Sequence, residues 1–413
     1  MPSAPEATRH FVRIWLPGAV EPVPSGVLTT TPDGRHQFTY LPGYLARTDA
    51  IALWDLPLHG KPIEPRPGLR IAGCLADAGP DLWGQRVVAR AAGTDVTALP
   101  TPALLAAVGG DRIGGLEVTA RPDDAVLAAP NGTLAELVEG VDRLEHGARF
   151  ATDHGSAPAS ADVAMLAACG VGGARPKALY SEGGTAYIAK FDSPLDTYPV
   201  LHAEAVATNL AARVGLNVAR SRVVHIAGRD VQLVERFDRP GGGRRRLLVS
   251  ALTLAGLPVE RAGEATYWGL MDTLRTYAAD PAATLRDLFT RVAFNMAVGN
   301  TDDHARNHAA FWDGTTLELT PAYDLCPELR PGYTEQAMAI GRDGWKRSHL
   351  PGLIGRASEF GVPPAEARDI VHQQLDAIRA GWTDAADECR LTAEDRAYLW
   401  ERRILNPDVV DGL

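Results

Sequence analysis

An apolar helix that ends at a glycine and runs directly into a string of polar residues is the feature that most constrains how this chain folds. Apolar side chains recur there at the spacing of one helix face, at Leu285, Leu288, Phe289, Val292 and Met296. The pattern breaks at Gly299, and residues 299–307 read Gly-Asn-Thr-Asp-Asp-His-Ala-Arg-Asn. The sequence therefore predicts a core helix that leads into a polar loop.

This polar loop carries an aspartate and an asparagine at a spacing that phosphoryl transfer uses. Asp302 and Asn307 form an Asp-x4-Asn pattern, and Asp324 follows seventeen residues after Asn307. Phosphoryl transfer needs one carboxylate to orient the attacking hydroxyl, and an amide and a carboxylate to hold Mg²⁺ on the nucleotide phosphates. The three residues match that order. Taken alone, Asp-x4-Asn equally fits a solvated turn with an Asx cap.

A lysine in an apolar strand and a glutamate on the next helix extend the pattern. Strand signals cover 178–191, and Lys190 interrupts their apolar run. Glu204 lies fourteen residues later, in an amphipathic helix expected over 201–215. In kinases, a helix glutamate holds a strand lysine that contacts the phosphates. An edge-strand lysine that faces water is the alternative.

Two further segments fall in kinase order along the chain. Residues 170–177 form a glycine-rich loop, in which backbone N–H groups can approach phosphate oxygens. Glu235 and Phe237 end a second strand region, expected over 222–236, where a kinase hinge binds adenine. A plain hairpin turn and an ordinary charged strand end are the alternatives. Six such signals in one order indicate a kinase far more strongly than any one of them.

The charge balance excludes one class of function. The 413 residues include 41 Lys and Arg against 51 Asp and Glu, so the net charge is −10 and bulk positive charge does not hold this chain on nucleic acid. The arginine run at 244–246 is more typical of a solvated loop than of an anion contact. Four cysteines without a CxxC spacing fit free thiols in a reducing cytoplasm. With no evident signal peptide or apolar span, the sequence predicts a soluble, cytoplasmic protein without membrane contact.

Several strings along nearly the whole chain resemble the HipA family, the serine/threonine kinases that act as toxins of bacterial type II toxin–antitoxin systems. In the kinase part they are Gly-Gly-Ala-Arg-Pro-Lys (172–177), Val-Glu-Arg-Phe-Asp-Arg (234–239), the string at 299–307 and Pro-Ala-Tyr-Asp-Leu (321–325). In the N-terminal part they are Leu-Pro-Leu (56–58), Pro-Asp-Leu-Trp-Gly (80–84) and Val-Gly-Gly-Asp-Arg-Ile-Gly-Gly (108–115).

The resemblance implies a role for each matching residue. Asp302 would be the catalytic base, and Asn307 and Asp324 would ligate Mg²⁺. Lys190 would contact the ATP phosphates, and kinase logic makes Glu204 its partner. The remaining ATP contacts would come from the glycine-rich loop, the hinge and the catalytic loop, at Val171, Gly172, Gly173, Ala174, Arg175, Lys177, Glu235, Phe237 and His304.

The resemblance also implies partners and shows one difference. A small HipB-like DNA-binding antitoxin would carry the protein to DNA, and the phosphorylated target would be an aminoacyl-tRNA synthetase or a similar protein. Family members close to the best-known toxin start the glycine-rich loop with a serine, whose autophosphorylation switches the kinase off. Gly170 stands at the matching position here, which puts that mode of self-inactivation in doubt.

Three other functions stay open at this stage. A kinase of the same fold that phosphorylates a small molecule or a lipid head group has a similar catalytic string. A metal-dependent hydrolase would use His304 and His308, which share one face if the segment is helical, beside Asp302 and Asp303. A non-catalytic subunit would only bind an antitoxin and assist repression.

The predicted fold class is α+β, a bilobal fold like that of protein kinases. We expect a β-rich N-terminal module over 1–125, a linker helix and a β/α nucleotide lobe over 126–262, and an all-α C-terminal lobe over 263–413.

Overall fold

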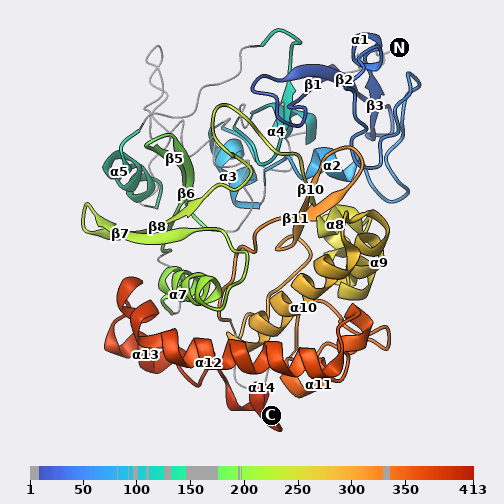
Figure 1. Cartoon of the computed structure of the whole chain (residues 1–413). Coiled ribbons are helices and arrows are strands. Elements are labelled where there is room, and N and C mark those ends of the chain that lie inside the picture. Colours follow the sequence, from blue (N-terminus) through green and yellow to red (C-terminus); the bar gives the residue numbers. More distant parts are fainter. Residues whose placement is uncertain are drawn as a thin grey trace.

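The computed structural model describes residues 9–80, 82–91, 93–95, 101–107, 111–124, 132–145, 175–193, 196, 198–328 and 335–413. In this part of the chain, the N-terminal strands lie in the upper part of Figure 1 together with several short helices, and the C-terminal helices lie in the lower part. No helix among the described residues combines the length and the apolar character that crossing a membrane requires.

The N-terminal sheet has the strand order β3-β2-β1-β4, with antiparallel pairing throughout. Its strands are β1 (Arg9–Ile14), β2 (Val23–Thr30), β3 (His36–Tyr40) and β4 (Leu116–Thr119). A hairpin turn over residues 31–34, which read Thr-Pro-Asp-Gly, joins β2 to β3, and in it the N–H of Gly34 donates to the carbonyl of Thr31 at 2.9 Å. Short helices complete this region: α1 (Pro42–Leu45), α2 (Gly73–Ala76), α3 (Leu82–Ala91) and α4 (Thr101–Ala107).

A second antiparallel sheet, in the order β5-β6-β8-β7, contains the strand lysine. Its strands are β5 (Lys177–Glu182), β6 (Thr185–Phe191), β7 (Ser221–Ile226) and β8 (Arg229–Glu235). Helices α5 (Leu134–Glu145) and α7 (Val200–Arg213) accompany this sheet. Gly215 follows α7 with a φ of 83°, a backbone conformation that glycine adopts without strain, and so ends the helix as its sequence predicts.

The rest of the chain is helical around a small sheet of order β11-β10-β9. The strands are β9 (Leu248–Ser250), β10 (Ala309–Trp312) and β11 (Leu317–Leu319). The α-helices are α8 (Ala251–Leu254), α9 (Tyr267–Tyr277), α10 (Pro281–Ala297), α11 (Leu350–Ile354), α12 (Pro364–Glu388), α13 (Ala393–Leu399) and α14 (Pro407–Val410). Two 3-10 turns are η2 (Val259–Glu264) and η3 (Ala357–Phe360).

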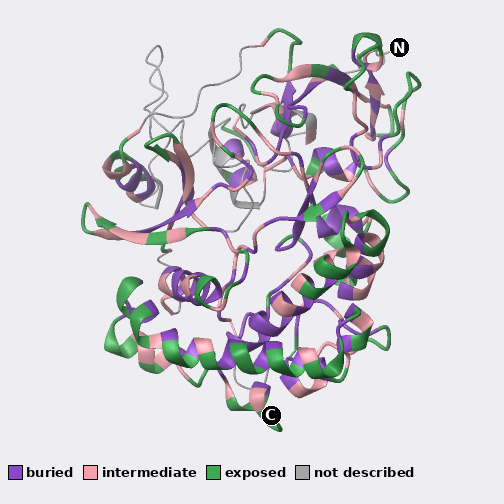
Figure 2. Cartoon of the chain, in the orientation of Figure 1, coloured by how far each residue is buried: buried purple, intermediate pink, exposed green. Residues whose placement is uncertain are grey.

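Two apolar cores underlie these elements, and the larger one continues from the N-terminal sheet into the helical lobe. It includes Ile14 of β1, Val206 of α7 and Phe294 of α10. A smaller core lies under the second sheet, where Phe191 and Val231 pack with Val88 of α3 and Leu104 of α4. Figure 2 shows the buried residues concentrated where these elements face one another. Helices in the N-terminal third of the chain therefore support the sheet that holds Lys190.

We predict that Gly26→Ala destabilises the N-terminal sheet. A Cβ atom on Gly26 would overlap the Phe38 ring and lie 2.9 Å from the carbonyl oxygen of Thr39, so the paired strands β2 and β3 would have to move apart. Overpacking of this kind costs about 1–3 kcal/mol. Gly43→Ala is the matched control, because no atom lies within 4 Å of its added Cβ. Urea unfolding of both variants checks this; equal stability of the two would contradict it.

Candidate active site

Helix α10 is the base on which the predicted catalytic loop rests. Asp280 caps its N-terminus by accepting a hydrogen bond from the N–H of Ala283, and Val292 and Phe294 are fully buried. The helix ends as predicted at Gly299, whose φ of 72° turns the chain. The N–H of Asn300 then donates to the carbonyl of Asn295 at 2.8 Å. The loop thus leaves the core at a defined angle.

Two neighbouring aspartates in this loop have opposite environments. Asp303 is 1% exposed, and its carboxylate accepts hydrogen bonds from the Tyr267 hydroxyl and from Asn295 Nδ2 at 2.7 Å, with His308 Nε2 at 2.8 Å. Asp302 is exposed. Because three buried groups hold Asp303 in place, its neighbour is held facing outward.

Backbone contacts close the loop around Asp302. Its carbonyl oxygen accepts hydrogen bonds from the N–H of His304 at 2.8 Å and from Nδ2 of Asn307 at 3.2 Å. The N–H of Asn307 donates in turn to the carbonyl of His304 at 2.8 Å. Asn307 therefore lies next to Asp302. The side chain of Asn307 makes its bond to Asp302 through Nδ2, so the side-chain oxygen of Asn307 takes no part in that bond.

Lys190 joins three elements at one point. Its Nζ lies 2.5 Å from Oε1 of Glu204 on α7 and 2.9 Å from Oδ1 of Asp324, which follows β11. Lys177 stands directly opposite Lys190 on the neighbouring strand β5. The sheet, helix α7 and the segment after β11 thus bring together four residues that the sequence separates by up to 147 positions.

The electrostatics of this point keep the lysine charged. Burial opposes the charge of Lys190, but Asp324 and Glu204 outweigh burial and raise its pKa. Lys190 lowers the pKa of Asp324 against the effect of burial, with help from Lys177 and His304. Burial raises the pKa of Glu204 more than Lys190 lowers it. The result is a protonated lysine beside an ionised Asp324.

The backbone at Asp324 has a conformation that residues other than glycine rarely adopt. Its φ is 59°, in the left-handed region, which costs roughly 1–2 kcal/mol for a residue with a Cβ atom. The neighbouring Tyr323 hydroxyl donates to the carbonyl of Arg306 at 2.7 Å and so ties this segment to the catalytic loop. Strain of this kind persists at functional sites where surrounding contacts hold it.

The predicted hinge lies at the end of β8. Glu235 pairs with Tyr187 of β6, and the Phe237 ring lies 5.6 Å from the ring of Tyr323 and 5.9 Å from that of Phe311. The intervening Arg236 is buried and contacts Asp238 at 2.9 Å and Asp111 at 2.9 Å. Because Asp111 belongs to the loop before β4, the hinge is anchored to the N-terminal region.

The remaining residues predicted to contact ATP belong to the glycine-rich loop and the catalytic loop. Val171, Gly172, Gly173 and Ala174 lie outside the described residues, as does Gly170. Arg175 makes an ion pair with Asp196. His304 is half-buried, and among the described residues its Nδ1 has no hydrogen-bond partner.

One expectation for the loop is wrong. His304 and His308 do not share a helix face, because residues 301–308 form no helix and His308 is buried against Asp303. Among the described residues, no group of three or more His, Cys, Asp or Glu side chains gathers as metal ligands. Of the two histidines considered for a hydrolase, His308 instead holds the loop in place through its contact with Asp303.

The sequence reading missed Tyr267 and Asn295, which hold Asp303. Asn295 is a polar residue inside the apolar face of α10, and that is a usable signal. Tyr267 lies 36 positions before Asp303, and no local pattern joins the two.

A strand lysine that contacts a helix glutamate and an aspartate after a polar loop, in an α+β chain with a helical C-terminal part, defines a kinase-like protein. Family models match both parts of the chain: the HipA-like C-terminal domain over residues 169–382 and the HipA N-terminal domain over residues 14–119. The chain therefore belongs to the HipA family.

Two curated relatives are similar to parts of this chain. The putative kinase Y4mE of Sinorhizobium fredii is 29% identical over 208 residues, which are 45% of this chain and 47% of that protein. The serine/threonine-protein kinase toxin HipA of Shewanella oneidensis is 28% identical over 184 residues, 39% of this chain and 42% of that protein. The chain thus spans less than half the length of either relative.

A solved structure shares the fold over almost the full length. It is a chain of the complex of HipA, HipB and operator DNA from Shewanella oneidensis MR-1, with a TM-score of 0.67, 21% identity, and coverage of 92% of this chain and 93% of that chain. The α+β fold predicted from the sequence is confirmed.

We predict that replacing the two neighbouring aspartates changes the free energy of unfolding by very different amounts. Asp303→Ala leaves Tyr267, Asn295 and His308 without their buried acceptor and should cost about 3–5 kcal/mol. Asp302→Ala removes an exposed side chain and should change the free energy of unfolding by less than about 0.5 kcal/mol. Denaturant unfolding of the two variants measures this, and equal losses would disprove the division of roles.

Proposed function

We propose that this protein is a Mg-ATP-dependent serine/threonine-protein kinase. The observation that carries the proposal is the contact of Lys190 with both Glu204 and Asp324, from three separate elements, close to a loop that exposes Asp302. A charged lysine held between a helix carboxylate and a loop carboxylate is the arrangement with which kinases aim an ammonium group at phosphates.

The residues at this point fit ATP and Mg²⁺. Lys190 and Lys177 place two cations on adjacent strands, and the buried Nδ1 of His304 is a polar atom that lacks a partner among the described residues. Asp324 and the amide oxygen of Asn307 are hard oxygen ligands of the type that Mg²⁺ prefers. Glu235 and Phe237 would hold the adenine. The glycine-rich residues 171–174, with Arg175 and Lys177, would cover the phosphates.

The mechanism assigns a separate task to each residue. When bound, ATP supplies the transferred phosphoryl group and Mg²⁺ neutralises its charge. Asp302 accepts a hydrogen bond from the attacking hydroxyl and orients it. Lys190 holds a phosphate oxygen, and Glu204 keeps Lys190 in position. Since Asp302 is exposed, the acceptor hydroxyl of a protein can reach it. Most of the rate gain would come from positioning and electrostatic stabilisation.

The wider role that we propose is that of the toxin of a type II toxin–antitoxin system in the cytoplasm. The family assignment and the fold shared with the HipA chain of the HipA–HipB–operator complex support it. A HipB-like antitoxin would bring the protein to DNA, which fits a net charge of −10 that disfavours direct binding. The substrate would be an aminoacyl-tRNA synthetase or a similar protein of translation.

We predict that Asp302→Ala lowers phosphoryl transfer by about 100-fold or more, since it removes the group that orients the hydroxyl. The assay incubates each variant with γ-labelled ATP and a bacterial lysate, and mass spectrometry identifies the labelled band. Asp376→Ala, which removes another exposed aspartate, is the control and should label at the wild-type rate.

Each outcome of this assay bears on the proposal. Full labelling by a folded Asp302→Ala variant would reject Asp302 as the base. Turnover of small molecules without protein labelling would favour the small-molecule or lipid kinase. No labelling, together with no Mg-ATP binding by calorimetry of the folded wild type, would favour a non-catalytic antitoxin-binding subunit.

A further inference from the structure

A loop of the N-terminal region contacts the segment that carries the two proposed adenine-binding residues. Asp111 lies in this loop, which leads into β4, and Arg236 lies between Glu235 and Phe237 at the end of β8. Asp111 and Arg236 are 125 positions apart in the chain. The contact joins two groups of residues, which we call the anchoring cluster: Asp111, Arg112 and Gly114 on one side, and Arg236, Asp238 and Arg239 on the other.

Arg236 is the centre of the anchoring cluster. Its Nη1 donates to Oδ1 of Asp111 at 2.9 Å, and its Nη2 donates to the carbonyl of Arg112 at 2.7 Å. Nη2 also donates to Oδ2 of Asp238 at 2.9 Å, and Nε donates to Oδ1 of the same carboxylate at 3.1 Å. The side chain of Arg236 is 1% exposed. Because a planar guanidinium bonded along its edges resists rotation, these bonds restrict the chain at residue 236.

Arg239 and Gly114 make further contacts within the anchoring cluster. Nη2 of Arg239 lies 2.9 Å from Oδ1 of Asp111, and its Nη1 donates to the carbonyl of Gly114 at 2.9 Å. The N–H of Gly114 donates to Oδ2 of Asp238 at 2.7 Å. Asp111 therefore accepts from two arginines at once. Loss of its carboxylate would leave both arginines to share Asp238.

The two carboxylates of the anchoring cluster are held in their charged forms. Burial by itself would raise the pKa of Asp111, but Arg236 and Arg239 outweigh burial and lower it. The same two arginines lower the pKa of Asp238 against burial. The hydrogen bonds of the cluster are thus charge-assisted, which makes them roughly twice as strong as bonds between neutral groups.

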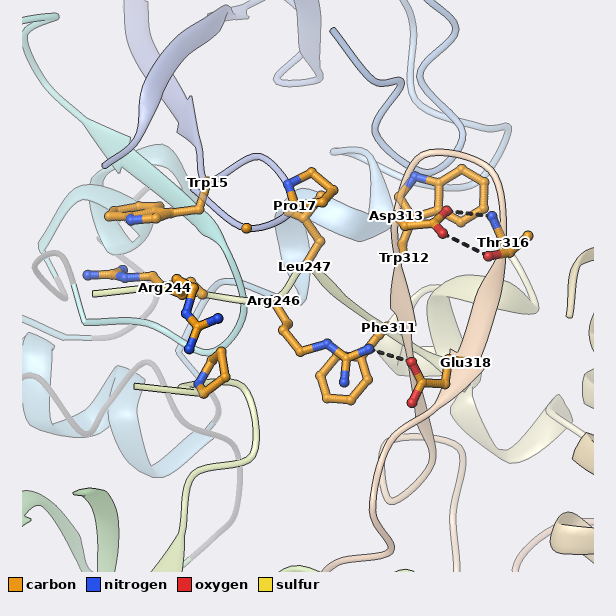
Figure 3. A pocket seen from close by; sticks show the side chains of 13 residues that line it. Trp15, Pro17, Arg244, Arg246, Leu247, Phe311, Trp312, Asp313, Thr316 and Glu318 are labelled. Atoms are coloured by element: carbon orange, nitrogen blue, oxygen red, sulfur yellow. Dashed lines mark hydrogen bonds and ion pairs between the residues drawn. The ribbon is translucent and has the colours of Figure 1, made fainter. Parts of the chain in front are cut away.

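The ring of Phe237 is supported from its other side by a stacked arginine. It lies 5.9 Å from the ring of Phe311, and the guanidinium carbon of Arg246 lies 3.4 Å from the centre of that second ring. Figure 3 shows Arg246 beside Phe311, with its ion pair to Glu318. Phe237 therefore follows Arg236 directly and packs against a ring that is itself fixed.

The segment that follows the anchoring cluster also contacts the N-terminal region. The N–H of Arg246 donates to the carbonyl of Asp238 at 3.1 Å. The guanidinium carbon of Arg245 lies 3.7 Å from the ring centre of Trp15, which follows β1. The N-terminal region thus contacts the chain both within the hinge and a few residues beyond it.

We propose that Asp111 is a positioning residue for the adenine of ATP. It acts through Arg236 on Glu235 and Phe237 and does not itself touch the nucleotide. The inference rests on the proposed function, in which these two residues hold the adenine. Since they are the chain neighbours of Arg236, an arginine released from Asp111 would let both of them shift, and small displacements of positioning groups are costly.

The effect is expected on the adenine alone. The ion pairs of Asp111 with described residues go to Arg236 and Arg239, and none of them reaches Lys190. Lys190 has its own support from Glu204 on α7 and from Asp324. The proposed phosphate contacts would therefore keep their geometry when Asp111 is replaced.

Two ligands separate the binding of adenine from the binding of the phosphates. Calorimetry on the full chain measures the affinity for Mg-ATP and for Mg-tripolyphosphate, which has three phosphates and no nucleoside. Asp111→Asn should weaken the binding of Mg-ATP about tenfold, or about 1.4 kcal/mol, and leave that of Mg-tripolyphosphate unchanged. A general loss of folded structure would weaken both ligands.

Glu117→Gln is the matched control. It removes another buried carboxylate of the N-terminal region, which pairs with Arg13 at 2.8 Å and lies outside the anchoring cluster. It should keep the wild-type ratio of the two affinities. If Asp111→Asn fails to fold, Arg239→Gln replaces it, because it removes one of the two arginines on Asp111 and leaves Arg236 in place. It should weaken Mg-ATP binding about threefold, again without an effect on Mg-tripolyphosphate.

The outcomes distinguish a failure of this inference from a failure of the proposed function. A folded wild type that does not bind Mg-ATP would overturn both. A wild type that prefers Mg-ATP to Mg-tripolyphosphate, with the same preference in Asp111→Asn or its replacement, would overturn the inference alone. Equal weakening of both ligands would also overturn it, since Asp111 would then have only a structural role. So would a loss of the preference in Glu117→Gln.

Discussion

The buried carboxylate of Asp303 is the contact on which the proposed catalytic loop depends. This carboxylate is almost fully buried and is contacted by three side chains from two helices and the loop itself, Tyr267, Asn295 and His308. Because an unpaired polar group there would be costly, these contacts stabilise the arrangement of the loop in which Asp303 is paired. That arrangement exposes Asp302 and puts Asn307 beside it. The proposed chemistry of the loop thus rests on a neighbour that takes no part in it.

The N-terminal region and the kinase-like part are bound together by buried polar contacts as well as by a shared core. Asp77 accepts hydrogen bonds from the backbone N–H of Ser250 at 2.8 Å and from its hydroxyl at 2.7 Å. Asp111 contacts Arg236, which lies between the two proposed hinge residues. The loop before β4 is therefore in direct contact with the proposed hinge. The divisions at 125 and 262 stay a prediction, and packing by Val88 and Leu104 crosses the first.

Sequence reasoning succeeded where chemistry is tied to local pattern. The helix over 281–297, the strands around Lys190 and the hairpin turn at 31–34 follow from periodicity and turn residues, and all are present. The order of the kinase signals also anticipated that Lys190 would contact Glu204. It failed for His308, and it did not anticipate that Arg245 and Arg246 stack on aromatic rings, because a spacing says nothing about which distant carboxylate or ring a side chain will meet.

By itself, the sequence determined the family, the α+β class and the residue types that phosphoryl transfer needs. These properties follow from short sequence motifs and from the spacing of apolar residues in helices and strands. Only the tertiary structure decided which of two adjacent aspartates is buried, that Lys190 contacts two carboxylates at once, and that Arg245 and Arg246 stack on aromatic rings. Each of these depends on contacts between residues far apart in the chain. The free energy of such contacts comes from burial and pairing in three dimensions, which no local spacing encodes.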